Sequence, residues 1–452
     1  MQLGFFGATQ TVTGSKYLLT CGKHKVLIDC GLFQGFKNLR LKNWAHLPFE
    51  PKELDAVVLT HAHIDHSGYL PRLRNSGFKG PIYATHATSA LCKILLPDSG
   101  FLQEEQARLA NKYGFSKHNP ALPLYTREDA ERCLHQFEQV RFGEVLDVTK
   151  GVRASFHPSG HLLGAASVRL EHEGRSIVFS GDVGRSSDPL MKAPGAVPAA
   201  DYVVLESTYG DRAHVEIDPL PELAAALRRA IADDGIIVIP TFAVGRAQLL
   251  MLLIARLKAA GELPNVPVFL DSPMAIDATE LYVRYASEHR LSQEECRAMC
   301  QAVTYVRTPE QSKTLGQLRS SAIILAASGM ATGGRVLHHL KIFAPDARNL
   351  ILLSGYQAGG TRGASLAAGA KTLRIHGQDI PIRAEVAQLS SMSGHADANE
   401  LMEWLKRFLP SPKRIFITHG EPSASDAFRH RIEMELTLDA LVPDYRDQVE
   451  LG

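Results

Sequence analysis

His61-Ala62-His63-Ile64-Asp65-His66 places four potential metal ligands within six residues. The stretch follows an apolar run, Ala56-Val-Val-Leu-Thr60, which predicts a β-strand. Two histidines that alternate after a strand direct both imidazoles to the same side of the backbone. We expect Asp65 and His66 in a loop that leads into a helix starting near Ser67. Imidazoles and carboxylates without a thiolate suit Zn²⁺, or a similar divalent ion, in an open catalytic site.

Further potential ligands follow other apolar runs. Asp29 ends Lys25-Val-Leu-Ile-Asp29, Asp182 ends Ser176-Ile-Val-Phe-Ser-Gly-Asp182, and His419 ends Arg414-Ile-Phe-Ile-Thr-His419. His161 lies in Ser159-Gly-His161-Leu-Leu-Gly. Most of these residues have a glycine close by, which permits a sharp exit from a strand. Each alone is typical of an ordinary turn, but together they predict a shared site at one edge of a sheet.

These motifs, in this order, resemble the metallo-β-lactamase superfamily, whose hallmark is the His-x-His-x-Asp-His run. Three later motifs are similar to its β-CASP branch: Leu205-Glu206-Ser-Thr-Tyr-Gly-Asp211, Ser393-Gly-His395-Ala-Asp397 and Thr418-His419-Gly-Glu421. The histidine in the last motif is similar to the RNA-cleaving members, including the endonuclease that processes the 3′ end of eukaryotic pre-mRNA and its bacterial and archaeal relatives. DNA-processing members commonly carry valine there. The resemblance covers nearly the whole chain.

The resemblance implies two zinc ions per chain. Their ligands would be His61, His63 and His161 for one ion, Asp65, His66 and His419 for the other, and Asp182 between the two. Asp29 would accept a hydrogen bond from a ligand histidine and so fix its tautomer.

The same resemblance places His395 and Glu206 as a hydrogen-bonded pair near the metals, and we predict His395, Glu206 and Asp65 as the catalytic residues. Two metals roughly 3.5–4 Å apart can activate a water for in-line attack on phosphorus. His395 would then protonate the leaving sugar oxygen, while Glu206 stabilises the imidazolium. The expected products are a 5′-phosphate and a 3′-hydroxyl.

Composition is typical of a soluble intracellular enzyme. Of 452 residues, 45% are hydrophobic and 21% charged, and the net charge is +1. The six cysteines form no C-x-x-C, and no apolar run is long enough to span a bilayer. We therefore expect a cytoplasmic protein without a membrane partner. Because the whole-molecule charge is small, affinity for a single-stranded RNA substrate must come from a local basic groove and the metals.

The pattern of elements predicts an α/β fold in two parts. Short strands with hairpin turns run to about Glu206, and a loop is expected from Gly100 to Leu124. Alternating strands and helices then fill Gly210 to Pro381, with helices over 247–260, 275–288 and 335–342, which is typical of a parallel, Rossmann-like sheet. Together with the resemblance, this predicts a metallo-β-lactamase αββα sandwich (1–208 and 385–452) into which a β-CASP domain (209–384) is inserted, with a cleft over the metals.

Two glycine-rich turns in the inserted part, Ser328 to Arg335 and Gly355 to Arg362, join a strand to a helix. Backbone N–H groups at such a turn can hold a phosphate, although a tight turn alone explains the glycines. Since the turns also match family stretches that face the cleft, we predict that Arg335, Arg362 and Ser393 contact the RNA backbone.

Three functions compete for this sequence. The first is a zinc-dependent, mainly endonucleolytic ribonuclease. The second is a hydrolase of small thioesters or lactams, which would need neither the long insertion nor His395. The third is a non-catalytic RNA-binding protein, which would usually have lost metal ligands. The oligomeric state stays open, a homodimer included.

Overall fold

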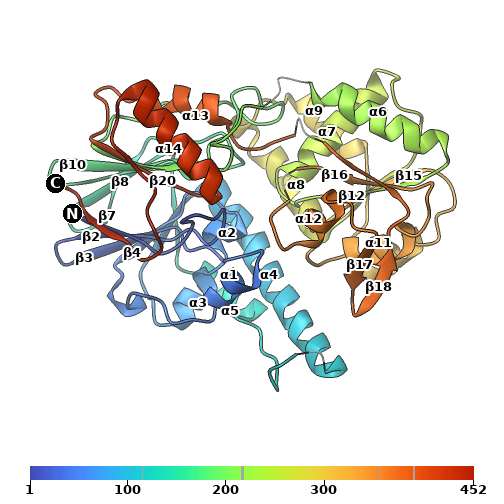
Figure 1. Ribbon diagram of the computed structural model, residues 1–452, viewed down its shortest axis with the longest axis horizontal. Helices are drawn as coiled ribbons and strands as arrows, with labels where there is room; N and C mark the ends of the chain where they lie inside the picture. Colours follow the sequence, from blue (N-terminus) through green and yellow to red (C-terminus); the bar gives the residue numbers. More distant parts are fainter. Residues whose placement is uncertain (115, 215–217, 356, 390–391) are drawn as a thin grey trace. The chain divides into compact units, whose positions relative to one another are not determined.

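The chain folds into two compact units (Figure 1), described by a computed structural model for residues 1–114, 116–214, 218–355, 357–389 and 392–452. The first unit contains residues 1–213 and 395–452, and the second contains residues 214–394. The domain boundaries expected from the sequence, after residues 208 and 384, lie five and ten residues before these junctions. His395 belongs to the first unit and Ser393 to the second.

Two seven-stranded sheets form the first unit. In spatial order, the first sheet contains β22 (Gln448–Glu450), β1 (Gln2–Phe5), β2 (Tyr17–Cys21), β3 (His24–Ile28), β4 (Ala56–Val58), β5 (Ile82–Thr85) and β6 (Phe137–Val140). The second contains β21 (Ala440–Leu441), β20 (Arg414–Thr418), β11 (Tyr202–Glu206), β10 (Arg175–Phe179), β9 (Ala166–His172), β8 (Val152–Pro158) and β7 (Val145–Thr149).

The sheets pack face to face because their strands alternate between two apolar faces. In β11, Tyr202 and Val204 enter the core between the sheets, whereas Val203 and Leu205 pack with α13 (Ala398–Leu405) and α14 (Pro422–Leu436). Of the helices that precede β6, α1 (Lys37–Lys42), α3 (Leu70–Asn75) and α5 (Arg127–Leu134) lie on the side of the first sheet (Figure 1). The others in this part of the chain are η1 (Pro51–Glu53), α2 (Ile64–Ser67) and α4 (His86–Tyr113). The first unit is thus an αββα sandwich, as predicted.

The second unit contains a six-stranded sheet whose paired strands are all parallel. In spatial order it contains β14 (Thr304–Tyr305), β13 (Val268–Asp271), β15 (Ala322–Ala326), β12 (Ile236–Pro240), β16 (Leu350–Leu353) and β19 (Glu385–Gln388). Its other elements are the hairpin β17 (Thr372–Ile375) and β18 (Gln378–Pro381), and the helices α6 (Pro219–Ala232), α7 (Arg246–Ala259), α8 (Pro273–Arg284), η2 (Ala286–Glu288), α9 (Gln293–Gln301), α10 (Pro309–Leu315), α11 (Val336–Phe343) and α12 (Arg362–Ala367). The central strands are buried along their whole length, as in other sheets covered on both faces.

Four local expectations were wrong. β4 already ends at Val58, and Asp65 and His66 lie on the short helix α2 rather than in a loop. The expected loop from Gly100 is helical as far as Tyr113, because Gly100 lets the start of α5 approach α4: a Cβ there would lie 2.7 Å from the Arg127 backbone. Helix α8 ends at Arg284 instead of continuing to residue 288.

Among the described residues, no helix combines the length and the apolar character needed to cross a bilayer.

Phe416→Ala should lower the free energy of unfolding of the first unit by roughly 3–5 kcal/mol, the usual loss for a truncated core phenylalanine. Phe416 is buried between the sheets, with its ring centroid 5.3 Å from that of Phe5. Trp44 and Trp404 both belong to this unit, so tryptophan fluorescence during urea unfolding follows it. Met434→Ala, at a site 71% exposed, is the matched control and should change stability by less than about 0.5 kcal/mol. Equal losses in both variants would contradict the proposed core.

Candidate metal centre

The side chains predicted as metal ligands lie close together in the first unit, on segments that follow its strands. They form two groups whose ligand atoms lie within 4.8 Å of one another: His61, His63, His161 and Asp182, and Asp65, His66 and His419. Asp182 and His419 also form a third group with Glu206. Residues up to 358 positions apart in the sequence thus share one site.

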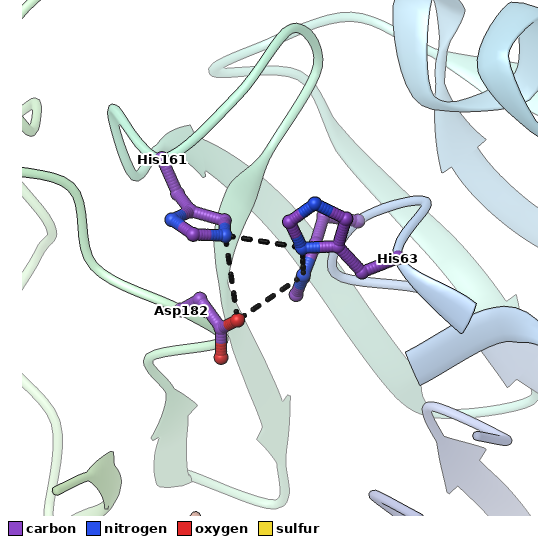
Figure 2. Close-up of side chains that lie close together, drawn as sticks. His63, His161 and Asp182 are labelled. Atoms are coloured by element: carbon purple, nitrogen blue, oxygen red, sulfur yellow. Dashed lines mark hydrogen bonds and ion pairs between the residues drawn. The ribbon is translucent and has the colours of Figure 1, made fainter. Parts of the chain in front are cut away.

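Three imidazole nitrogens of the first group face one another. His63 Nδ1 lies 3.2 Å from His61 Nε2 and 3.1 Å from His161 Nε2. Asp182 Oδ2 completes the group, 3.3 Å from His61 Nε2 and 3.5 Å from His161 Nε2, and Figure 2 shows His63, His161 and Asp182 turned toward one another. Ligands about 2.0–2.1 Å from a tetrahedral zinc ion are about 3.3 Å apart, so these separations fit such an ion.

The second group has similar dimensions. His66 Nε2 lies 3.1 Å from His419 Nε2, which in turn lies 3.5 Å from Asp65 Oδ2. The other oxygen of Asp182, Oδ1, lies 3.2 Å from His66 Nε2. The two oxygens of this one carboxylate therefore face different groups, which is the arrangement needed for a residue that bridges two ions.

The donor set fits cations and little else. Asp182 Oδ1 is buried and has no hydrogen-bond partner among the described residues, which is costly for a carboxylate oxygen. Burial, together with the neighbouring imidazoles, lowers the pKa of His63 to about 3 and holds the pKa of His161 well below its usual value. Neutral imidazoles present lone pairs rather than protons, and neutral histidine is the form that binds metals.

Asp29 orients two of the ligand histidines. His66 donates from Nδ1 to Asp29 Oδ2 over 2.7 Å, so its Nε2 lone pair points into the cluster. The Thr60 hydroxyl donates to the same oxygen over 2.8 Å and lies 3.1 Å from His61 Nδ1. Because a hydroxyl has one proton, Thr60 must accept from His61, whose Nε2 then also faces the cluster. One buried carboxylate thereby sets the tautomer of a histidine in each group.

Two kinds of backbone turn bring the ligands back over the sheets. Asp29 and His419 adopt the left-handed conformation themselves, with φ of 57° and 51°. His161 and Asp182 instead follow the left-handed Gly160 and Gly181. The expectation that glycine provides the sharp exit is correct for the second pair and wrong for the first. Left-handed non-glycine residues cost about 1–3 kcal/mol and cluster at functional sites.

The glycines after Asp29 and His419 have another role, which is to allow close approach. A Cβ on Gly31 would lie 1.6 Å from the Asp65 carbonyl oxygen, and a Cβ on Gly420 would lie 2.3 Å from Ser207 Oγ. Any larger residue at Gly31 would therefore push away the backbone that carries a ligand of the second group.

His395 and Glu206 form a pair beside the ligand groups. His395 Nδ1 lies 3.2 Å from Glu206 Oε2, and Glu206 Oε1 accepts the Val183 N–H over 2.6 Å. Glu206 is buried, whereas the His395 side chain is 21% exposed. Burial lowers the pKa of His395, but the carboxylates of Glu206 and Asp182 outweigh burial and raise it to about 9. A histidine held by a buried carboxylate and open to solvent can keep and deliver a proton.

The three residues predicted to contact phosphate lie in the second unit. Arg335 donates to Asp271 over 2.6 Å and to the carbonyls of Val306 and Arg307. Arg362 donates to the Arg374 carbonyl over 2.8 Å, and Ser393 is buried. Both guanidinium groups thus contact the protein itself, and their contact with RNA stays a prediction. Position 356, within the second glycine-rich turn, lies outside the described residues.

Two residues of the site were missed by the sequence reasoning. Thr60 connects Asp29 to His61, as described above. Thr208 Oγ1 lies 3.1 Å from His419 Nδ1. Thr60 directly precedes the predicted ligand His61, and Thr208 lies two residues after Glu206. Hydroxyl residues beside the predicted motifs are therefore the signal that could have identified both.

Comparison with known proteins identifies the family. Residues 12–241 match the metallo-beta-lactamase superfamily, residues 247–366 match the Beta-Casp domain, and residues 379–443 match the Zn-dependent metallo-hydrolase RNA specificity domain. The first match spans the residues of the first ligand group.

Several proteins align over most of the chain. Ribonuclease TTHA0252 of Thermus thermophilus is 39% identical over 93% of this chain and 93% of its own length. An RNase J-like protein of Methanocaldococcus jannaschii is 30% identical over 98% and 97%, and the transcription termination factor FttA of the same organism is 30% identical over 100% and 72%.

The fold also has a solved counterpart. The crystal structure of a protein of unknown function from Enterococcus faecalis V583 covers 100% of this chain and 99% of its own, with a TM-score of 0.58 and 15% identity. Given the family models and the relatives that align over nearly its whole length, this chain belongs to the metallo-β-lactamase superfamily, in the branch that carries a β-CASP domain.

Proposed function

We propose that this protein is a ribonuclease that hydrolyses phosphodiester bonds of single-stranded RNA, mainly endonucleolytically, with two zinc ions per chain. The observation that carries the proposal is the arrangement of two ligand groups on the two oxygens of Asp182, next to the His395–Glu206 pair. The RNA specificity domain and the relatives named as ribonucleases support RNA as the substrate. The six free cysteines, five of them buried, suit the reducing cytoplasm.

Each of the two ligand groups would hold one metal ion. His61, His63 and His161 would hold one ion, Asp65, His66 and His419 the other, with Asp182 shared. Bound zinc supplies hydroxide at neutral pH and positive charge for the phosphate. The protein's own contribution would be to orient the histidines, which Asp29, Thr60 and Thr208 do through hydrogen bonds, and to keep His63 and His161 neutral by burial.

His395 would act as the general acid. The Glu206 carboxylate accepts the proton on Nδ1, so the proton to be transferred is the one on Nε2. As the P–O bond to the leaving sugar breaks, this proton moves to the leaving oxygen, which departs as a 3′-hydroxyl. Glu206 stays ionised and stabilises the imidazolium before transfer. Asp65 would serve as a ligand and, through its charge, favour the cationic ring.

Purified protein should contain about two zinc ions, cleave labelled single-stranded RNA, and lose cleavage with chelator. His63→Ala is the negative control, and this variant should lose bound zinc and RNA cleavage together. A chromogenic lactam and a glutathione thioester, assayed in parallel, should react far more slowly. Rapid thioester hydrolysis with intact RNA would favour a small-molecule hydrolase instead, and full zinc occupancy with unchanged activity in His63→Ala would refute the ligand assignment.

Thr60→Val should weaken zinc binding by roughly 10- to 100-fold, the usual effect of losing a group that orients a metal ligand. Valine keeps the shape of threonine but removes the proton donated to Asp29 and the acceptor for His61. Thr60→Ser keeps the hydroxyl and should bind zinc nearly as well as wild type. Competition with a metallochromic chelator measures the affinity. Equal affinities in the valine and serine variants would show that the hydroxyl does not orient His61.

His395→Ala should keep both zinc ions and bind RNA nearly as well as wild type, while kcat falls roughly 10²- to 10⁴-fold. Glu206→Gln should show a smaller loss of the same kind, because it keeps the imidazole and weakens only its partner. Zinc analysis, melting temperature and single-turnover cleavage are measured on one preparation. If His395 instead has a structural role, stability and RNA affinity would fall before turnover does.

A further inference from the structure

An exposed aromatic and basic surface surrounds helix α1, outside the metal site. Phe36 is 51% exposed, Leu41 55% and Trp44 55%. Phe36 is the N-cap residue of this helix, Arg40 lies on the helix and Trp44 lies in the turn after it, so the three residues follow one another at a spacing of four. Lys37 and Leu41 are their exposed neighbours. We refer to these five residues as the 36–44 face.

The 36–44 face is positive in a nearly neutral protein. Residues 30–49 contain no aspartate or glutamate, although the whole chain has a net charge of only +1. No ion pair found in the described part of the chain involves Lys37, Arg40 or Lys42. Lys42, on the same helix, lies 4.0 Å above the Tyr445 ring, and burial together with repulsion by Arg446 lowers its pKa. Positive charge is thus concentrated here without acidic partners of its own.

Hydrogen bonds attach this surface to the metal-ligand region. Cys30 N donates to the His66 carbonyl over 2.7 Å, and Leu32 N donates to the Ile64 carbonyl over 2.9 Å. Leu32 therefore touches the helix that carries Asp65 and His66, and the four residues onward to Phe36 span at most about 14 Å.

The far end of the segment is fixed as well. The buried Asn43 side chain accepts from Phe33 N over 2.9 Å and donates to the Phe33 carbonyl over 2.8 Å. Both ends of the segment thus meet at Phe33, and the surface is formed before any ligand binds. A preformed surface loses less conformational entropy on binding.

We propose that the 36–44 face is a docking surface for single-stranded RNA next to the metal ligands. Phe36 and Trp44 stack on bases, and Lys37 and Arg40 neutralise phosphates. The inference rests on the proposed ribonuclease function and names where the substrate is held. Bases stack on exposed aromatic rings whatever their sequence, and the cations between the rings follow the backbone. Aromatic residues and arginine also occur at protein interfaces, but lysine is depleted there, and a positive surface without acidic residues complements the phosphates of RNA.

Tryptophan fluorescence provides a direct test. Trp404 is 3% exposed and Trp44 55%, so quenching by acrylamide reports on Trp44. In a stopped-flow experiment before turnover, a single-stranded oligouridylate should quench the emission and protect it from acrylamide. Trp44→Ala and Phe36→Ala should each raise KM for RNA cleavage roughly 5- to 100-fold, the usual effect of removing one stacking ring, with kcat unchanged. Met434→Ala is the exposed apolar control and should leave KM unchanged.

Two further measurements distinguish the contribution of Lys37 and Arg40 to RNA binding from any effect on the hydrolysis step. Lys37→Gln combined with Arg40→Gln should make the dependence of log KM on log salt shallower by about 1.4, since each phosphate contact on a single strand contributes about 0.7. Hydrolysis of bis(p-nitrophenyl) phosphate, which is too small to reach the 36–44 face, should be unaffected in every variant.

The outcomes are distinct. A wild-type protein that cleaves neither RNA nor the small diester would refute the proposed function, while quenching of Trp44 by RNA would still support docking. A wild-type protein that cleaves RNA, with no quenching and unchanged KM in Trp44→Ala and Phe36→Ala, would overturn the docking surface. If these variants instead convert a dimer into monomers in sedimentation at unchanged KM, the face joins two copies of the chain and the proposal is wrong.

Discussion

Imidazole nitrogens and carboxylate oxygens that face one another at about 3 Å leave part of their hydrogen-bonding capacity unused unless cations lie among them. This constraint governs the first unit. Five histidines and two aspartates from distant parts of the chain converge there, and Asp182 keeps a buried oxygen without a hydrogen bond. Cations bound here would satisfy such atoms, so metal binding and the stability of this region are coupled. The apolar sandwich supplies the rigidity that holds the ligands together meanwhile.

Single atoms of the fold determine how the metal ligands are oriented. One oxygen of Asp29 accepts from His66 and from Thr60, so a single carboxylate controls one histidine in each ligand group. The glycine that follows permits the Asp65 backbone to approach. Substitutions of Asp29 or Thr60 would change how the ligand histidines are oriented and leave the number of ligands unchanged. Such variants therefore distinguish the orientation of a ligand from its presence.

The sequence predicted the sandwich, the parallel sheet and the residues that converge, because ligands that follow apolar strands in a recurring order carry long-range information. It could not predict local boundaries. Asp65 and His66 lie on a helix because α2 begins right after its N-cap residue His63, five residues after the end of β4. Helix α4 passes through Pro97 and Gly100 because packing against α5 outweighs their poor helix propensity. The ion pair of Arg335 with Asp271, 64 residues away in sequence, could not be predicted because neither residue belongs to a motif that relates the two, and the contact of Arg335 with phosphate stays a prediction.

The spacing of the ligands also has a consequence in time. His61 is synthesised 358 residues before His419, because the whole second unit lies between them. At about 5–20 residues per second, this separation corresponds to roughly 18–72 s of translation. Once Asp182 has been made, the nascent chain has the whole first ligand group, but it lacks His395 for a further 213 residues and His419 for a further 237. A chain made in this order completes its second ligand group only after the whole second unit has been synthesised, and the proposed nuclease would be inactive until then.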